Sequence, residues 1–484
     1  MSAFLPTALP PTEAPIPEGT RVSFDEHATF LDRDLVSGGS PWRLLRLTSP
    51  SFAVATRWRT NGVVRAGEER FARTLVQQGL LHPHFEVPLA MDQIDVVVPV
   101  YEDVESLATL LGNLVGFHVI VVDDGSRNAV AIARCVEEFD ATLVRLPVNH
   151  GPAFARNKGA LASARPFLWF VDVDIELGDP RDIARSLHNE FADPLVAATA
   201  PRVRGAAGPT KREQFEHHFG ALDMGGFSGL VVPGGPVSYV PSACLMVRRT
   251  SFGDGFDEFF RVGEDVDFVW RLFDKGWLVR YQAGAVVGHR ARTSWRSWFH
   301  QRHGYGESTA ALASRHGARL APLRADTWTM VAWASVLVGH PTFGARIVNG
   351  ARRHARDKFF SQQEAPDDVA TKVVAYNMMR AGGPLARAVV RTFGVVVLLS
   401  ALHPRLRARA LALFAVGTLW RWRHERLDLR DVPLAIVDDL AYGTGVFHGA
   451  WRAKSLQTLS PTITKSELGL REVLGVARET TTDN

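Results

Sequence analysis

Two aspartates, Asp172 and Asp174, are separated by one residue directly after an apolar segment. Carboxylates at this spacing can turn together toward one hard cation, and Mg²⁺ or Mn²⁺ binds such oxygen ligands together with phosphate oxygens. The alternative is an acidic pair exposed on a surface loop, which is the commoner place for a lone Asp-x-Asp sequence. The pair predicts a divalent-cation site because other acidic pairs occupy similar places in the chain.

Those other pairs are Asp123-Asp124 and Glu264-Asp265. The first pair follows an apolar segment and precedes Gly-Ser, a sequence that could also simply cap the next helix. The second pair stands at the start of a predicted helix, where the helix dipole favours an ionised carboxylate. An ionised carboxylate in this place is available as a general base.

Apolar runs predict the strands that must position these acids. Ile94–Val100 is nearly continuous in β-branched residues, as is typical of a strand buried on both faces. A helix over 104–114 and a second strand over 118–122 complete a βαβ unit, and another strand is expected over 166–171. The fold class is therefore α/β, with a mostly parallel sheet.

Ligands of open α/β sheets bind beyond the carboxyl ends of the strands. Pro99–Glu102 and Asp123–Ser126 follow the first two strands, so we expect them to converge on one pocket. Residues 149–159, with the sequence NHGPAFARNKG, are expected to form a loop at the same edge.

The composition is that of a globular protein of about three domains, since 46% of the 484 residues are hydrophobic and 22% are charged. Two cysteines exclude a disulfide framework and favour a reducing compartment. Residues 1–20 are rich in proline and are expected to be a disordered tail without signal-peptide character. The apolar runs 327–340 and 392–402 are shorter than the roughly 20 residues of a membrane span.

Residues 21–90 alternate short predicted strands with helices over 42–47, 51–58 and 68–77, an arrangement typical of a winged-helix domain. Residues 1–90 hold nine basic and nine acidic side chains, so the electrostatic basis of nucleic-acid binding is missing. The segment resembles PqqD-like domains, which bind a peptide by adding it as an edge strand. The alternative is a structural module packed on the α/β domain that follows it.

Five segments resemble family 2 glycosyltransferases of the GT-A fold, over about residues 93–310: VVVPVYEDVESL, VVDDGS, NHGPAFARNKG, FVDVDIE and GEDVDFVWRL. The resemblance implies a nucleotide-sugar site formed by Pro99, Tyr101, Glu102, Asp123, Asp124, Asn149, Arg156, Asn157 and Asp172. It implies a Mg²⁺ or Mn²⁺ ion held by Asp172, Asp174 and His289, although His289 could instead be a packing residue. It makes Asp265 the catalytic base, with Glu264 positioning it or contacting the acceptor.

The resemblance is incomplete after the catalytic segment. Processive relatives carry a Gln-x-x-Arg-Trp motif, whereas this chain has the sequence WFHQRH at 298–303. Neither processive synthesis nor a role for Arg302 is therefore implied.

The C-terminal region is basic, with nine arginines and one acid between Arg380 and Arg426. The apolar runs 392–402 and 410–420 lie among these arginines, a pattern that suits the surface of an anionic membrane. The alternative is a soluble helical hairpin whose arginines are solvated or paired with acids. The expected domains are thus the tail 1–20, the PqqD-like domain 21–90, the GT-A domain 91–315 and a helical region 316–484.

The combination of a PqqD-like front, this catalytic domain and an Arg-rich end is similar to the mycofactocin glycosyltransferases. This implies an inverting, metal-dependent transfer of a hexose, expected to be glucose from UDP-glucose, to a peptide-derived redox cofactor, and a short β-linked oligosaccharide as product. It also implies a cytoplasmic enzyme, with peripheral membrane contact left open. The alternatives are a lipid or envelope-polysaccharide acceptor and a non-catalytic scaffold that binds peptide.

Overall fold

The computed structural model describes residues 8–59, 61–290 and 294–465. The chain divides into two compact units, Met1–Thr293 and Ser294–Asn484. The sequence predicts the end of the catalytic domain near residue 315, whereas helix α10 (Trp295–His316) belongs to the second unit.

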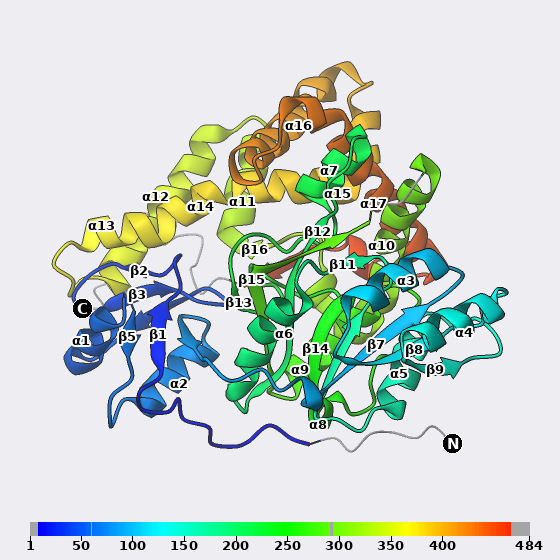
Figure 1. The fold of residues 1–484 in the computed structure, drawn as a ribbon. Helices are drawn as coiled ribbons and strands as arrows, with labels where there is room; N and C mark the ends of the chain where they lie inside the picture. The colour runs from blue at the N-terminus through cyan, green and yellow to red at the C-terminus, as the bar shows by residue number, and fades with distance from the viewer. Residues whose placement is uncertain (1–7, 60, 291–293, 466–484) are drawn as a thin grey trace, which may run out of the picture. The chain divides into compact units, whose positions relative to one another are not determined.

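The first unit begins with a small module of two three-stranded antiparallel sheets. One sheet has the order β5-β1-β6 and the other the order β2-β3-β4, and the helices α1 and α2 accompany them (Figure 1). The bounds are β1 Arg21–Phe24, β2 Thr29–Phe30, β3 Leu35–Gly38, β4 Arg43–Arg46, α1 Ser49–Arg57, β5 Gly62–Val63, α2 Glu69–Gln77 and β6 Leu81–His84.

Two expectations for this module are wrong. The helix expected over 42–47 is the strand β4, because β3 lies one short turn away and pairs with it from Leu35–Arg46 to Gly38–Arg43. The disordered tail expected over 1–20 does not extend through its described part. Ile16 is fully buried in the core, and the Ala8 amide donates to the carbonyl of Thr250.

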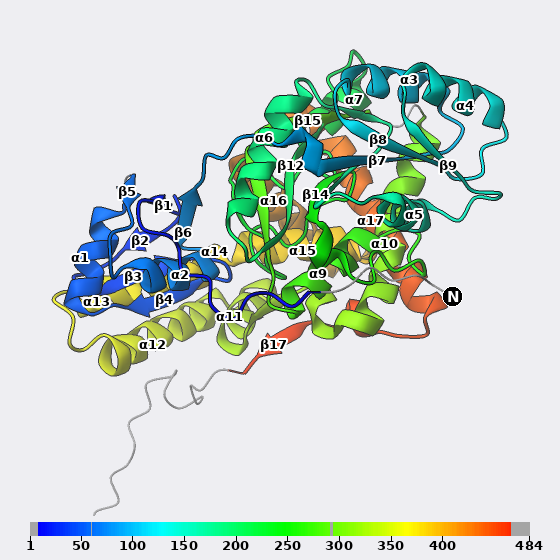
Figure 2. The ribbon, with the colours of Figure 1, turned by 60° about the horizontal axis from the view of Figure 1, so that its bottom comes forward.

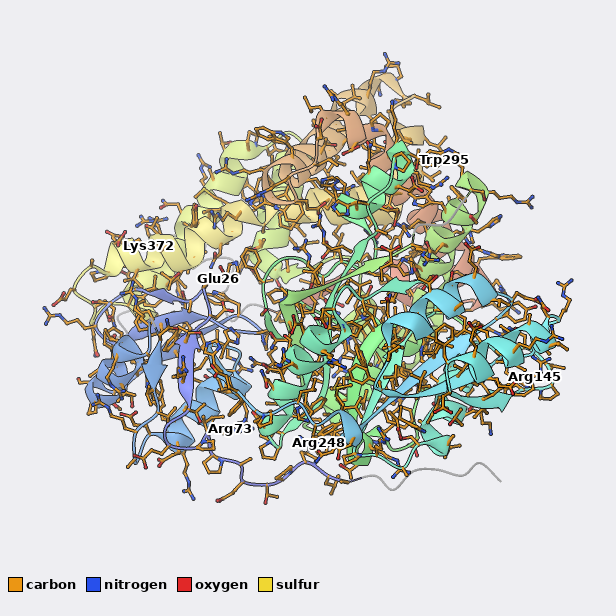
Figure 3. All side chains as sticks on the ribbon, viewed as in Figure 1. Glu26, Arg73, Arg145, Arg248, Trp295 and Lys372 are labelled. Carbon is orange, nitrogen blue, oxygen red and sulfur yellow. The ribbon has the colours of Figure 1, made fainter. Side chains whose placement is uncertain are left out.

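The module is joined to the rest of its unit by buried charges. Arg73 of α2, labelled in Figure 3, donates two hydrogen bonds of 2.8 Å to the carboxylate of Asp193. Both side chains are at most 9% exposed. His82 of β6 lies between Asp25, 3.0 Å from its Nε2, and Arg280, 3.4 Å from its Nδ1. Such contacts are those of a module packed against the rest of its unit.

The rest of the first unit is an α/β domain built on a nine-stranded sheet with the order β11-β15-β12-β14-β10-β7-β8-β9, with β13 paired to β15. The pairs β9-β8, β8-β7, β7-β10 and β12-β15 are parallel. The bounds are β7 Ile94–Val100, β8 His118–Asp123, β9 Thr142–Arg145, β10 Phe167–Val171, β11 Ile175–Glu176, β12 Val196–Gly205, β13 Gly229–Leu230, β14 Cys244–Arg248 and β15 Leu278–His289.

Helices cover both faces of the parallel strands. The helices α3 (Val104–Asn113) and α4 (Ala129–Glu138) lie on one face, and α5 (Pro152–Ala162) lies on the other (Figures 1 and 2). Further helices are α6 Pro180–Asn189, α7 Lys211–Phe219, α8 Arg249–Phe252 and α9 Glu264–Asp274. The apolar strand runs predicted from the sequence form the core, since Val96, Val121 and Trp169 are fully buried.

The loop predicted over 149–159 is wrong, because most of it belongs to α5. The helix begins at Pro152, whose fixed φ suits the first helical position, after Gly151 at a φ of 98°. At Gly159 a Cβ would overlap the side chain of Val97 in β7. The glycines that made the segment read as a loop allow the helix to start sharply and to lie close to the sheet.

The second unit is mainly helical. Its longer helices are α10, α11 Thr327–Leu337, α12 Pro341–Phe359, α15 Gly382–Ser400, α16 Pro404–His424 and α17 Val432–Arg452. The short elements are α13 Pro366–Ala370, α14 Tyr376–Arg380 and the parallel pair β16 Arg324–Asp326 with β17 Thr462–Thr464. Two arginines of this unit pair with buried acids, and one of them, Arg387, belongs to the basic stretch between Arg380 and Arg426. Arg302 lies 2.8 Å from Asp438, and Arg387 lies 2.6 Å from Asp439.

The helical segment Pro366–Ser400 spans 35 residues, with a π-helical turn at Thr371–Ala375 and a kink at Phe393, and the mean hydropathy of its most apolar window is 1.5. This segment is long and apolar enough to cross a membrane by length and composition, and 33% of that window is buried. The apolar run 392–402 considered from the sequence is shorter than a membrane span, because polar residues separate it from the rest of this helical segment. Core helices of soluble proteins meet the same criterion.

Candidate active site

The ends of β7 and β8 meet as expected from the parallel register, in which Val100 lies beside Asp123. The backbone amide of Glu102 donates to the Ser126 hydroxyl at 2.9 Å, and the Glu102 carboxylate accepts from the Arg127 amide at 2.9 Å. Glu102 has a φ of 63°, a left-handed conformation that is uncommon for residues other than glycine. Cross-loop hydrogen bonds therefore hold the two sequence-predicted loops together.

Asp123 is completely buried at the end of β8. Its carboxylate accepts from the Ser126 amide at 3.0 Å and forms an ion pair with Arg145. Arg145 also donates to the Ser126 carbonyl at 2.8 Å. The β8-β9 register explains the contact, because it places Arg145 directly beside Asp123.

Asp124 anchors the start of α5. Its two carboxylate oxygens accept from the amides of His150 and Gly151, each at 2.8 Å. Carboxylates are favourable at this end of a helix because they satisfy free amides and complement the helix dipole. The sequence left open that this acidic pair caps the helix that follows it. Asp124 does cap a helix, but this helix is α5 rather than the next helix in the chain, α4.

The Asp-x-Asp sequence and His289 lie at one place. The short strand β11, which begins one residue after Asp174, pairs with the end of β15 and brings Ile175 beside His289. The His289 Nε2 atom lies 3.4 Å from the nearer carboxylate oxygen of Asp174, and both side chains are partly exposed. Carboxylate oxygens and an imidazole nitrogen are ligands suited to Mn²⁺, so these residues fit a divalent-cation site.

Arg156 of α5 links the acidic pair after β10, Asp172 and Asp174, with the pair Glu264 and Asp265. It is 2% exposed, and it donates to Asp172 at 2.6 Å and to Glu264 at 2.9 Å. Burial alone lowers the pKa of Arg156, but the carboxylates of Asp172 and Glu264 outweigh this effect and raise it. The guanidinium is therefore a fixed positive charge between the two acids.

Glu264 and Asp265 form the first turn of α9, after Gly263 in the left-handed region at a φ of 90°. The pKa of Glu264 is raised to about 7, because burial and, to a smaller extent, the charge of Asp265 raise it while Arg156 opposes the shift. Burial also raises the pKa of Asp265, against the amide of Val266, which donates to its carboxylate at 2.8 Å. The sequence analysis expected the helix dipole to keep these acids ionised, but the cost of burying a charge is larger here.

Among the other residues of the implied nucleotide site, Asn157 is hydrogen-bonded within the domain, whereas Tyr101 is exposed. Asn157 uses its amide to hold the backbone of Phe256, donating at 2.8 Å and accepting at 2.9 Å, and it also donates to Glu258 at 3.1 Å. These bonds make Asn157 a positioning residue for the segment before α9. Tyr101 is 45% exposed at the end of β7, and Pro99 precedes it within the strand.

Two partners of these residues were missed in the sequence analysis. Arg145 follows the apolar core of β9, and the parallel register between neighbouring strand ends could have indicated its proximity to Asp123. Arg261, which donates to the Asn149 side chain at 3.2 Å, lies 112 residues away from it, and no local pattern indicated the contact.

Comparisons with known proteins agree with this arrangement. Residues 95–256 match the family model described as glycosyl transferase family 2. Proteins named pre-mycofactocin glycosyltransferase from two strains of Mycobacterium tuberculosis are 33% identical to the chain over 473 residues, covering 93% of this chain and 99% of each relative. An N-acetylglucosaminyl-diphospho-decaprenol L-rhamnosyltransferase of the same species is 42% identical over 101 residues, covering 20% of this chain and 32% of the relative.

Among solved structures, the mannosyltransferase PcManGT from Pyrobaculum calidifontis, in complex with GDP-Man and Mn²⁺, is 16% identical. It aligns over 76% of this chain and 90% of its own, with a TM-score of 0.42. The match to the pre-mycofactocin enzymes extends over nearly the whole of both chains. The chain is therefore a family 2 glycosyltransferase of the GT-A fold and belongs to the same family as the pre-mycofactocin glycosyltransferases.

Proposed function

We propose that this enzyme transfers glucose from UDP-glucose to a hydroxyl of a small, peptide-derived acceptor of the mycofactocin type, with inversion at the anomeric carbon. The observation that carries the proposal is the 33% identity to pre-mycofactocin glycosyltransferases over 99% of their length. Successive transfers would extend the product to a short β-linked oligosaccharide. The non-catalytic scaffold considered from the sequence is set aside, because the family consists of enzymes.

In this proposal the nucleotide of the donor lies against Pro99, Tyr101 and Glu102 and the adjoining turn of Asp123 and Asp124. Support comes from the hydrogen bonds that join these two loops. Asn149, Arg156 and Asn157 act through the segments that they hold, since each is hydrogen-bonded to another part of the domain. The exposed ring of Tyr101 is free to stack on a base.

Asp172, Asp174 and His289 would hold a divalent cation, which would neutralise charge developing on the departing diphosphate. Asp265 would accept the proton of the attacking hydroxyl, and Glu264 would hold Asp265 in place. The raised pKa of Asp265 supports its role as the base, because a base is most effective when its pKa is near the working pH.

The test is transfer by the purified chain from labelled UDP-glucose, GDP-mannose and UDP-N-acetylglucosamine to a mycofactocin-type peptide-derived acceptor with Mn²⁺ present. We expect transfer from UDP-glucose alone and a β-linked product by NMR. An α-linked product would contradict inversion, and transfer from another donor would contradict the assigned sugar.

A lipid acceptor is the second candidate, and exposed apolar side chains in the second unit favour it. Leu398 and Leu399 at the end of α15, with Leu402 in the turn that follows, are between 41% and 74% exposed, and the exposed arginines of α16 come next: Arg405, Arg407 and Arg409. Apolar and basic side chains together favour the surface of an anionic membrane. We propose peripheral contact of a cytoplasmic enzyme with such a membrane.

Sedimentation with vesicles tests this contact. The chain should sediment with phosphatidylglycerol vesicles and be released by salt, and Leu399→Glu with Leu402→Glu should abolish binding. Transfer to a polyprenyl-phosphate sugar, but not to the peptide-derived compound, would favour the lipid acceptor over the first candidate.

The N-terminal module is proposed to recruit the peptide part of the acceptor or its carrier protein. The strand β4 lies at the edge of its sheet, and Arg43 and Arg46 at its ends are exposed. Replacing both arginines with glutamate should raise the KM for the acceptor with little change in kcat. An unchanged KM would leave the module with only the structural role that its buried contacts support.

A further inference from the structure

Three potential metal ligands lie together on two helices of the second unit. His303 and Glu307 are four residues apart on one face of α10, and His448 lies on α17. The Nδ1 atom of His303 is 3.9 Å from a carboxylate oxygen of Glu307, and that of His448 is 3.6 Å from the same oxygen. One ligand atom from each residue lies within 4.8 Å of the others.

We propose that His303, Glu307 and His448 form a transition-metal site that binds Zn²⁺, separate from the cation site of sugar transfer. Two imidazoles and one carboxylate are a donor set that Zn²⁺ takes in proteins while keeping its fourth position open. Ligand atoms about 2.0–2.1 Å from a tetrahedral ion lie roughly 3.4 Å apart. The separations of 3.6 and 3.9 Å are therefore closed by small rotations of the side chains.

The backbone under these ligands is held at close range. A Cβ at Gly445 would overlap the carbonyl oxygen of His303, and a Cβ at Gly449 would overlap that of Glu307. Figures 1 and 2 both show α10 and α17 side by side. Because the glycines fix the distance between the helices, the ligands start close to their binding positions. The free energy of metal binding would then stabilise the contact between the helices.

Arg452 distinguishes a metal site from an ordinary ion-pair cluster. Its guanidinium lies 2.6 Å from the other oxygen of Glu307, and its side chain is 65% exposed. This positive charge repels a cation at the proposed site, while the oxygen facing the two histidines stays available. Arg452→Ala should therefore tighten Zn²⁺ binding severalfold, whereas a cluster that only pairs Glu307 with cations would gain no affinity for metal.

The experiment is a titration of the full chain with Co²⁺, followed by visible absorption. A site with imidazole ligands and four or five donors gives an intense band, whereas the oxygen-rich site at Asp172 and Asp174 gives a weak one. We expect one equivalent of the intense band, its displacement by Zn²⁺, and its loss in His448→Ala and in His303→Ala. Asp174→Ala and the exposed control His340→Ala should retain it.

Zn²⁺ should also raise the Tm of the native chain but not that of His448→Ala. If His448→Ala and a folded His303→Ala both kept a Co²⁺ band as intense as that of the native chain, the proposed site would be overturned. An unchanged Zn²⁺ affinity in Arg452→Ala would overturn the role of Glu307 as a ligand. Circular dichroism shows whether each variant folds. If one histidine variant does not fold, the Co²⁺ band of the other one tests the site.

Discussion

Arg156 donates to Glu264 at 2.9 Å, and its other terminal nitrogen donates to Asp172 at 2.6 Å. One buried guanidinium thus connects the acids at the start of α9 with the acids after β10. The proposed donor and acceptor sides of the reaction share this charge. A change on one side is expected to alter the ionisation of the other.

Removing that charge should destabilise the catalytic domain. Arg156→Met would leave two carboxylates without their shared partner, and breaking a buried pair in this way costs about 3–5 kcal/mol. Chemical denaturation measures the loss. The control is Arg185→Met, whose ion pair with Asp182 is more than half exposed and should contribute less than about 1 kcal/mol. Equal losses in the two variants would contradict the role of Arg156.

The ionisation of Glu264 gives a prediction about pH. Its folded pKa of about 7 lies above the ordinary value of 4.5, because burial favours the protonated form. The stabilising contribution of this shift is therefore complete below pH 4.5 and is lost as the pH rises through about 7. In metal-free protein, the free energy of unfolding of the native chain should fall across this range relative to that of Glu264→Gln. Parallel pH profiles of the two proteins would show that Glu264 has an ordinary pKa.

The sequence predicted three strands of the catalytic domain well, since β7, β8 and β10 all lie within a residue or so of their expected bounds. Long runs of β-branched residues between glycines and acids leave little choice for such segments. The sequence also predicted that the loops after β7 and β8 converge, because the carboxyl ends of neighbouring parallel strands lie at the same edge of the sheet.

Other features depend on tertiary contacts that no local pattern contains. The loop expected over 149–159 is largely α5, since Asp124 satisfies the amides at its start from another strand end. The strand β4 replaces a predicted helix because β3 offers it a partner. Asp265 and Glu264 were expected to stay ionised at a helix start, and only the packing around α9 reveals the opposing effect of burial.

Arg73 provides a test of how the N-terminal module is attached. Arg73→Met would leave Asp193 buried without its partner and should lower stability by about 3–5 kcal/mol. Calorimetry with and without UDP-glucose identifies the transition of the catalytic domain, and we expect that transition itself to move to lower temperature. Arg70→Met, which removes an exposed pair with Glu13, is the control. If Arg73→Met lowered the temperature only of a transition that UDP-glucose does not affect, this would contradict the claim that the module packs against the catalytic domain.

The proposed cation site predicts a loss of donor binding. Asp174→Ala should abolish Mn²⁺-dependent binding of UDP-glucose in a folded protein, because a carboxylate ligand beside His289 is removed. Isothermal titration calorimetry measures the affinity, with Asp182→Ala as an exposed acidic control. Unchanged donor affinity in Asp174→Ala would place the cation elsewhere.

The central claim is that Asp265 takes the proton of the acceptor while other residues bind the donor. The most direct measurement compares kcat and donor affinity in the native chain, Asp265→Asn and Glu264→Gln, using UDP-glucose, Mn²⁺ and the peptide-derived acceptor. Asp265→Asn should keep donor affinity and lose kcat by about two to four orders of magnitude, and Glu264→Gln should lose less. Near-normal turnover in Asp265→Asn would contradict the account and make Glu264, with its pKa of about 7, the first alternative base.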